Sequence, residues 1–267
     1  MTDDASDRTG DPVTPRTDRS ATTAGADADG ETDASANTSA DPRDGDWPTV
    51  AAAGLAADGV WKRYDAAGWA LRDVTLPVPG RGVHVLAGPN GSGKSTLLSL
   101  LAGVAAPDRG RVTREGSVGL AFQQPSVHPT LTVAENLSTF GALSGGDPEP
   151  VAERLRLDPV RDRRAERLSG GYRRLLDLAL AVSKRPDYLL LDEPLAGLDD
   201  DSRHRVVSLV REQRTERAVV VVAHRLRALA PLVDTITVLA DGEVVAREYA
   251  AAVDDLQAWY AEQAGLD

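Results

Sequence analysis

Cysteine is absent from the 267 residues, and lysine is scarce, with Lys62, Lys94 and Lys184 as its only examples. Without cysteine the chain can form neither a disulfide framework nor a Cys-ligated zinc site. Long apolar runs are also missing, because no segment approaches the ~18–20 residues that cross a bilayer as a helix. The first residues lack the basic and apolar regions of a secretory signal. We therefore expect a cytoplasmic chain that reaches a membrane only through a partner.

Positive charge is in short supply, because 30 Lys and Arg stand against 41 Asp and Glu, a net charge of -11. Since nucleic-acid-binding proteins usually carry a basic surface, we expect no nucleic-acid partner. The acidity is concentrated at one end, where residues 1–50 hold 12 acidic and 4 basic side chains. The same segment has very few bulky apolar residues, which predicts a disordered acidic tail at 1–50. The folded body is expected from residue 51 onward.

Short apolar runs alternate with segments of helical periodicity through this body. A hairpin is predicted where Asp241 and Gly242 would form a type I′ turn between two apolar runs. The alternation predicts an α/β fold around a mainly parallel sheet. Runs with the continuous apolar character of buried parallel strands lie at residues 83–87, 118–122, 188–191 and 218–223. Helices are predicted at residues 94–102, 131–143 and 169–183.

A glycine-rich segment between the first of these strands and the first helix has the pattern G-x-x-x-x-G-K-[ST]. Its glycines let successive backbone N–H groups turn toward a phosphate, and the following helix adds the positive end of its dipole. Lys94 can reach the β- and γ-phosphates of a nucleotide, and the Ser95 hydroxyl can ligate Mg²⁺. The predicted nucleotide-binding loop comprises Gly88, Pro89, Asn90, Gly91, Ser92, Gly93, Lys94, Ser95 and Thr96.

Polar side chains follow two other predicted strands. Asp192 and Glu193 come directly after residues 188–191, and His224 follows the strand at 218–223. By themselves two acids are as often a solvated turn as a site, and a lone histidine is usually structural. Beside a phosphate-binding loop, Asp192 is placed to hold Mg²⁺ and Glu193 to polarise water as a general base. His224 lies at the same sheet edge and could contact a γ-phosphate, so the pattern predicts hydrolysis of a nucleoside triphosphate.

The order of the motifs resembles the ATP-binding cassette (ABC) family over roughly residues 55–247. The loop at 88–96 resembles its Walker A motif, Asp192 with Glu193 its Walker B motif and catalytic base, and His224 its switch histidine. Further segments are similar to its adenine-stacking aromatic residue, Q-loop, signature and D-loop: Tyr64, Gln123, Leu168-Ser169-Gly170-Gly171 and Gly197-Leu198-Asp199, respectively. Small departures from the family pattern occur at Tyr172, Asp200 and Ala223, and none removes a phosphate, metal or water contact.

The resemblance implies a P-loop NTPase fold with an antiparallel β subdomain and a small helical subdomain. The cassette would occupy residues 51–248, with the helical subdomain at about 124–180 and a C-terminal helix at 249–267. It also implies ATP and Mg²⁺ as ligands. The implied metal-binding residues are Ser95, Gln123 and Asp192, and the implied catalytic residues are Lys94, Glu193 and His224.

Cassettes of the family pair head to tail, so the resemblance implies that Ser169, Gly170 and Gly171 of one copy complete the ATP site of the other. Gln123 would couple the metal to a membrane partner. The predicted function is the ATP-hydrolysing subunit of an ABC transporter, a homodimer that works with separate permease subunits on the cytoplasmic face of the membrane. The run at 168–182, with Tyr172, Arg173 and Arg174, resembles cassettes of exporters and slightly favours an exporter. The transported substrate is not encoded in such a subunit.

Two alternatives remain. A soluble ABC ATPase of DNA repair, chromosome maintenance or ribosomes is one, although the long coiled-coil insertion of the repair and chromosome members is absent from this sequence. The ribosomal members usually carry two cassettes in one chain, whereas this sequence contains one. The other alternative is a nucleotide-binding regulator without significant turnover, which an ATPase assay distinguishes.

Overall fold

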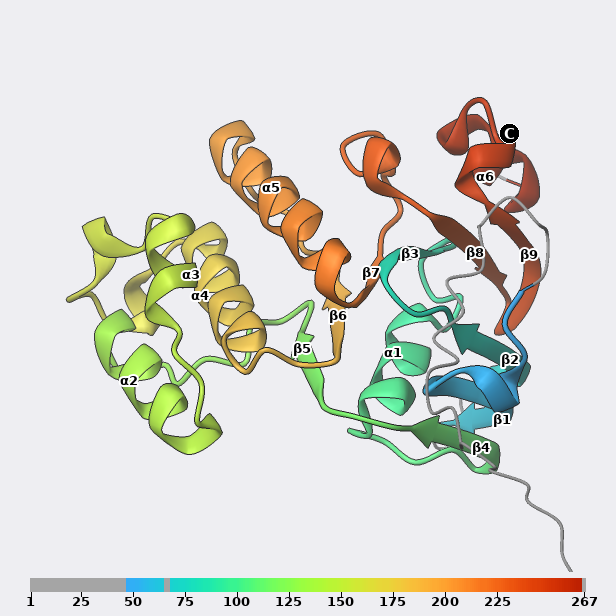
Figure 1. Ribbon diagram of the computed structural model, residues 1–267, viewed down its shortest axis with the longest axis horizontal. Coiled ribbons are helices and arrows are strands. Elements are labelled where there is room, and N and C mark those ends of the chain that lie inside the picture. The colour runs from blue at the N-terminus through green and yellow to red at the C-terminus, as the bar shows by residue number, and fades with distance from the viewer. Residues whose placement is uncertain (1–46, 65–67, 266–267) are drawn as a thin grey trace, which may run out of the picture. The chain divides into compact units, whose positions relative to one another are not determined.

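The computed structural model describes residues 47–64 and 68–265, and Figure 1 shows the arrangement of its elements. The prediction of a disordered tail concerns residues that lie almost entirely outside this part of the chain. Among the residues described, no helix is both long enough and apolar enough to cross a membrane.

A six-stranded sheet forms the centre of the fold, in the order β5-β6-β7-β3-β8-β9. Neighbouring strands from β5 to β8 run parallel, and β9 runs antiparallel to β8. The mainly parallel sheet is therefore confirmed. Its strands are β3 (Gly82–Ala87), β5 (Val118–Ala121), β6 (Tyr188–Asp192), β7 (Ala218–Val222), β8 (Thr235–Ala240) and β9 (Glu243–Tyr249).

Both faces of this sheet are buried, which explains why its central strands are continuously apolar. In β7, Val219 and Val221 pack in a cluster with apolar residues of α4 (Gly170–Ser183) and α5 (Asp200–Glu216). Val220 and Val222 point to the opposite face, where they pack with the leucines of α1 (Lys94–Ala102). The period of two along each strand thus divides the core into two layers.

A separate three-stranded antiparallel sheet has the order β2-β1-β4. It comprises β1 (Leu55–Arg63), β2 (Trp69–Val78) and β4 (Arg109–Arg114). Leu55 and Leu71 of this sheet are fully buried in the same cluster as Leu97 and Leu100 of α1. The antiparallel subdomain implied by the family resemblance is therefore present, and it packs on the helix that follows the glycine-rich loop.

Helices α2 (Val133–Ser144) and α3 (Glu149–Arg154) lie together with α4 in Figure 1, beyond strand β5. Helix α2 begins with a capping box, in which the Thr132 hydroxyl accepts from Glu135 N–H and the Glu135 carboxylate accepts from Thr132 N–H. Helix α4 begins at a Ser169 cap. These caps stabilise the exposed ends of short helices that would be marginal in isolation.

The C-terminal elements differ in part from the prediction. The hairpin is confirmed, with Asp241 at φ 48° and Gly242 at φ 82°, as a type I′ turn requires. Strand β9 continues to Tyr249, which pairs with Thr235, so a single helix from residue 249 onward is wrong. The helix is α6 (Leu256–Gln263), and its Leu256 and Tyr260 are buried in the core cluster that also contains Ile236 and Val238 of β8.

Candidate functional site

The glycine-rich loop joins the C-terminal end of β3 to the N-terminus of α1 and curls back on itself. Gly88, Gly91 and Gly93 have φ values of 153°, 83° and 99°, which side-chain-bearing residues rarely adopt. A Cβ at Gly88 would lie 2.2 Å from the Leu239 carbonyl oxygen, and one at Gly93 would lie 2.5 Å from the Ala70 carbonyl oxygen. Glycine is therefore required at both positions, because β2 and β8 hold the loop closely on either side.

Lys94 is buried within this loop. Its Nζ donates to the Pro89 carbonyl at 2.7 Å and contacts Ser92 Oγ at 3.4 Å. Burial lowers the pKa of Lys94, while the nearby carboxylates of Glu193 and Asp192 act to raise it. The loop therefore holds the Lys94 ammonium close to two carboxylates. A phosphate can bind to the ammonium, and a cation on that phosphate can bind to the carboxylates.

Asp192 is the last residue of β6 and is only 6% exposed. Burial raises the pKa of this carboxyl, and a hydrogen bond with the Ser95 side chain acts to lower it. Its Oδ1 is buried without a hydrogen-bond partner among the described residues. An unpaired carboxylate oxygen next to a serine hydroxyl fits Mg²⁺, which prefers hard oxygen ligands and completes its shell with phosphate oxygens and water.

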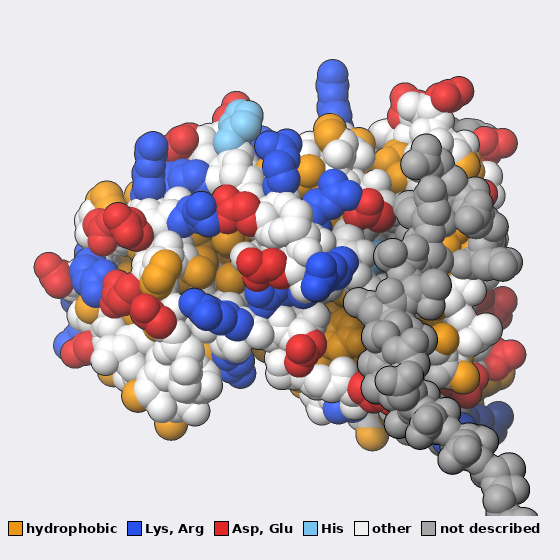
Figure 2. Space-filling view, viewed as in Figure 1, with side chains coloured by type: hydrophobic (Ala, Val, Ile, Leu, Met, Phe, Trp, Pro, Cys, Tyr) orange, Lys and Arg blue, Asp and Glu red, His pale blue; other side chains and the backbone are white. Residues whose placement is uncertain are grey.

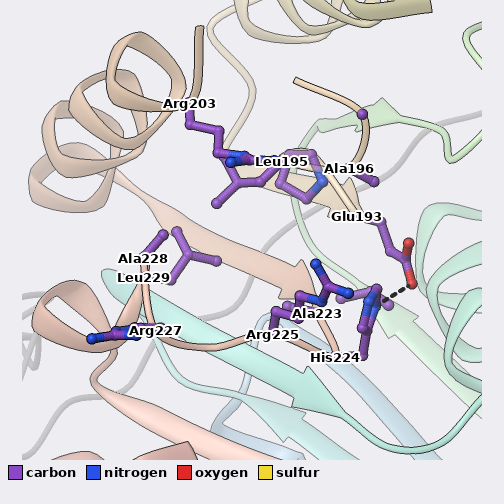
Figure 3. A pocket seen from close by; sticks show the side chains of 13 residues that line it. Glu193, Leu195, Ala196, Arg203, Ala223, His224, Arg225, Arg227, Ala228 and Leu229 are labelled. Atoms are coloured by element: carbon purple, nitrogen blue, oxygen red, sulfur yellow. Dashed lines mark hydrogen bonds and ion pairs between the residues drawn. The ribbon is translucent and has the colours of Figure 1, made fainter. Parts of the chain in front are cut away.

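Glu193 follows directly and contacts His224. The Glu193 N–H donates to the Val222 carbonyl at 3.0 Å, which ties the residue to the end of β7. Its Oε1 lies 3.0 Å from His224 Nδ1, and the Glu193 and His224 side chains are 13% and 43% exposed. Figure 3 shows this pair at the edge of a hollow, with Arg203 of α5 on another side. The hollow has a volume of about 410 Å³ and lies between residues 193–197 and 222–229.

Arg174 and Asp177 connect the signature helix α4 with this edge of the sheet, although the sequence analysis gave neither residue a role at the site. Arg174 Nη1 donates to the Glu193 carbonyl at 2.8 Å, and Nη2 donates to the Gln123 carbonyl at 2.9 Å. Asp177 accepts from the backbone N–H of Phe122 at 3.0 Å. The only signal in the sequence is an acid on the otherwise apolar face of a helix.

The remaining predicted residues lie outside this cluster. Ser169 and Gly170 are exposed at the start of α4, and no hydrogen bond or ion pair in the described structure joins them to the glycine-rich loop. Tyr64 is 49% exposed at the end of β1, with Lys62 Nζ 5.5 Å from its ring centroid. Gln123 is exposed, and its backbone carbonyl accepts a hydrogen bond from the Arg174 side chain.

A glycine-rich loop that meets two carboxylates at the carboxyl edge of a parallel sheet is the arrangement of P-loop nucleoside triphosphatases. The sequence model of one family in that class, described as ABC transporter, matches residues 71–196. A relative described below is 30% identical over 72% of the chain. The chain belongs to the ABC transporter family, as an ATP-binding cassette, and is thus an ABC ATPase.

Two relatives illustrate the likeness. A phosphonates import ATP-binding protein of Haloarcula marismortui is 30% identical over 224 residues, which cover 72% of this chain and 83% of that protein. A molybdenum import ATP-binding protein of Methylococcus capsulatus is 36% identical over 65% of this chain, but this stretch is about half of that protein, at 55%. This chain therefore spans only about half the length of the molybdenum import protein.

Solved structures agree on the fold. A dimeric ABC transporter cassette superposes with a TM-score of 0.67 at 25% identity, covering 73% of this chain and 98% of that one. The cbiO1 protein of Clostridium perfringens, part of the cbiONQ ABC transporter complex, superposes with a TM-score of 0.62 at 23% identity and covers 74% of this chain and 89% of its own. The α/β core with an antiparallel β subdomain is thus the fold of ABC cassettes.

Proposed function

We propose that this chain powers transport across a membrane by hydrolysing ATP at a site completed by a second copy, while separate permease subunits carry the substrate. The observation that carries the proposal is the 3.0 Å contact between Glu193 and His224 next to the glycine-rich loop. A general base must be oriented by a neighbour and must lie near the group that it activates. The placement would be on the cytoplasmic face of the membrane, through the permease.

Binding would use groups that the loop already presents. The backbone N–H groups of residues 88–96 and the Lys94 ammonium would hold the β- and γ-phosphates, with the α1 N-terminus behind them. Ser95, Asp192 and Gln123 would hold Mg²⁺, which when bound would offset the negative charge that develops on the phosphate oxygens. The exposed ring of Tyr64 would stack on adenine, because an aromatic face binds a base without needing hydrogen bonds.

Hydrolysis would follow from the position of Glu193. Its carboxylate would accept a proton from a water molecule as the water oxygen attacks the γ-phosphorus, and the bond from that phosphorus to the bridging oxygen of ADP would break. His224 would keep the Glu193 carboxylate in place through Nδ1 and face the γ-phosphate with the rest of its ring. Lys94 would neutralise charge on the transferring group.

The exposed residues at the start of α4 would complete the nucleotide site of a second copy. Ser169 and Gly170 stand at the N-terminus of α4, where backbone N–H groups and the helix dipole favour an anion. In a head-to-tail pair, Ser169, Gly170 and Gly171 of the partner would reach the γ-phosphate bound by this chain. The dimeric state of a solved cassette with the same fold supports this arrangement.

The direction of transport is not assigned to export. Both relatives described above are named for import, so they do not support the slight preference for an exporter that the 168–182 run suggested. A membrane partner is supported by the cbiONQ complex, which contains a cassette of this fold. These likenesses favour transport over a role in repair or on ribosomes.

The test is Glu193→Gln in the full chain, with ATP binding and steady-state hydrolysis measured in parallel. The amide keeps the shape of the side chain but cannot accept the proton, so we expect turnover to fall about 100-fold or more while ATP affinity is retained. Glu153→Gln is the matched control, because Glu153 is exposed on α3. Hydrolysis by Glu193→Gln at the rate of the control would rule out the assigned role.

A further inference from the structure

Helix α4 carries a buried acid on a face that is otherwise apolar. Asp177 is 4% exposed, and its neighbours Leu176 and Leu178 are buried in the core. Burial raises the pKa of the Asp177 carboxyl to about 6, although two backbone N–H groups and Arg174 act to lower it. A buried carboxylate is costly, so its presence needs an account in terms of what it contacts.

Both oxygens of Asp177 contact one loop. Oδ2 accepts from Phe122 N–H at 3.0 Å, and Oδ1 accepts from Ser126 N–H at 2.8 Å. These two amides stand at the two ends of the segment 122–126, which follows β5 and contains Gln123. The Asp177 carboxylate therefore joins the two ends of this segment, although Asp177 lies more than 50 residues away in the sequence.

Arg174 lies one turn earlier on the same side of α4 and reaches two further backbone groups. Its guanidinium donates to the Gln123 carbonyl at 2.9 Å and to the Glu193 carbonyl at 2.8 Å. The fork geometry of arginine allows one side chain to serve two acceptors at once. Segment 122–126 and Glu193 are thus held by two side chains of a single rigid element.

The backbone of Glu193 has a particular need of such a contact. Its φ of 49° lies in the left-handed region, which is uncommon for a residue with a side chain and persists where surrounding contacts fix it. Its N–H donates to Val222 on β7, and its carbonyl accepts from Arg174 on α4. The direction of the Glu193 side chain consequently depends on where α4 stands relative to the sheet.

We propose that Arg174 and Asp177 are positioning residues that clamp segment 122–126 and the Glu193 backbone to the signature helix, so that a shift of α4 moves the Glu193 carboxylate into or out of place for hydrolysis. Ser169, at the N-terminus of α4, is five residues before Arg174, or about 7–8 Å along the axis. Contact of Ser169 with a partner's nucleotide would therefore shift α4, and the rigid helix would move the Glu193 carboxylate. This inference rests on the proposed function, because it needs Glu193 as the base.

The test compares Arg174→Lys and Asp177→Asn with Arg173→Lys in the full chain. Lysine keeps the charge but cannot donate as a fork to both carbonyls, and asparagine has one acceptor oxygen for two N–H groups. Arg173 is the matched control, because its side chain is exposed on the adjacent position of the helix. Measured quantities are kcat and KM for ATP, ATP affinity, the midpoint of thermal unfolding and amide exchange at Phe122 and Ser126.

We expect kcat to fall about 10-fold or more in both variants while KM and ATP affinity stay within about twofold of the control. Faster amide exchange at Phe122 or Ser126 should accompany the loss in Asp177→Asn. Wild-type kcat in both variants, with Glu193→Gln inactive, would overturn the clamp and leave the proposed function standing. A loss of ATP affinity that matches the loss of kcat would also overturn it, since it would assign these residues to folding of the site. If Asp177→Asn does not fold, Arg174→Lys decides by the same criteria.

Discussion

At the scale of single residues, Glu193 is fixed by three groups from two parts of the chain, the end of β7 and helix α4. Val222 accepts from its N–H, Arg174 donates to its carbonyl, and His224 contacts its carboxylate at 3.0 Å. A carboxylate held in this way would need little reorganisation to act as the general base that we propose. The φ of 49° is the local cost of this placement, and the contacts offset it.

His84 gives a prediction on stability, because it is buried in β3 and its Nδ1 contacts Thr235 Oγ1 at 2.9 Å. Burial lowers the pKa of His84 to about 4. The Asp234 carboxylate acts to raise this pKa, and the Arg214 guanidinium acts to lower it further. The unfolded chain then binds a proton more readily than the folded chain between pH 6.5 and pH 4. Stability from the neutral ring is therefore lost as pH falls through that window, by about 2 kcal/mol between pH 7 and pH 5.

The measurement is urea unfolding of wild type and His84→Asn at pH 7 and pH 5. Asparagine can keep the contact with Thr235 but does not titrate, so wild type should lose about 2 kcal/mol more than the variant on acidification. His204→Asn serves as the control, since His204 is exposed on α5. An equal loss in wild type and His84→Asn would show that the His84 ring does not titrate as described.

Residues whose side chains we propose to take part in the reaction were suggested by the sequence, and residues that contact backbone groups at the site were not. The glycine-rich loop, Asp192 and His224 were found because each follows a strand of a parallel sheet, and such strands end at one edge. Arg174 and Asp177 bind carbonyl and N–H groups of distant residues. Backbone groups are the same at every position, so no sequence pattern marks which of them a side chain will reach.

At the scale of elements, helix α2 offers a test of how far its cap stabilises the fold. Thr132→Ala removes the hydroxyl that accepts from Glu135 N–H at 3.1 Å. The loss of such a cap costs about 1 kcal/mol, or roughly 2–4 °C in the thermal midpoint of a chain of this size. Thr139→Ala is the control, because Thr139 is exposed in the interior of α2, where alanine favours the helix. A midpoint for Thr132→Ala equal to that of the control would contradict the capping role.

The elements that sequence patterns predicted are those buried on both faces or on one clear face. Strands β3, β6 and β7 have continuous apolar runs because helices or the second sheet cover both of their sides. Helix α5 was missed, since only Val206, Leu209 and Val210 carry its buried apolar face among many charged residues. Strand β1 was missed because register shifts after Ala57 interrupt its alternation. Only the family resemblance supplied the antiparallel sheet.

At the scale of the whole molecule, charge and site belong to different parts of the chain. The net charge is -11, and residues 1–50 hold 12 of the 41 acidic side chains but only 4 of the 30 basic ones. On the face drawn in Figure 2, basic and acidic side chains are interspersed over the helices. The charge of the chain from residue 51 onward is therefore close to balanced. The positive charge that we propose for phosphate binding is that of Lys94, which is buried inside the loop.

In the transporter that we propose, two copies share each hydrolytic site, with Glu193 of one copy and Ser169 of the other at the same nucleotide. The most direct measurement is analytical ultracentrifugation of Glu193→Gln with ATP, with ADP and without nucleotide. With turnover blocked, ATP stays bound and should hold two chains together, so we expect a dimer with ATP and a monomer otherwise. Adding Ser169→Arg should abolish the dimer while each chain still binds ATP. A Glu193→Gln chain that saturates with ATP yet stays monomeric, or a dimer that persists with Ser169→Arg, would contradict a site shared between two copies.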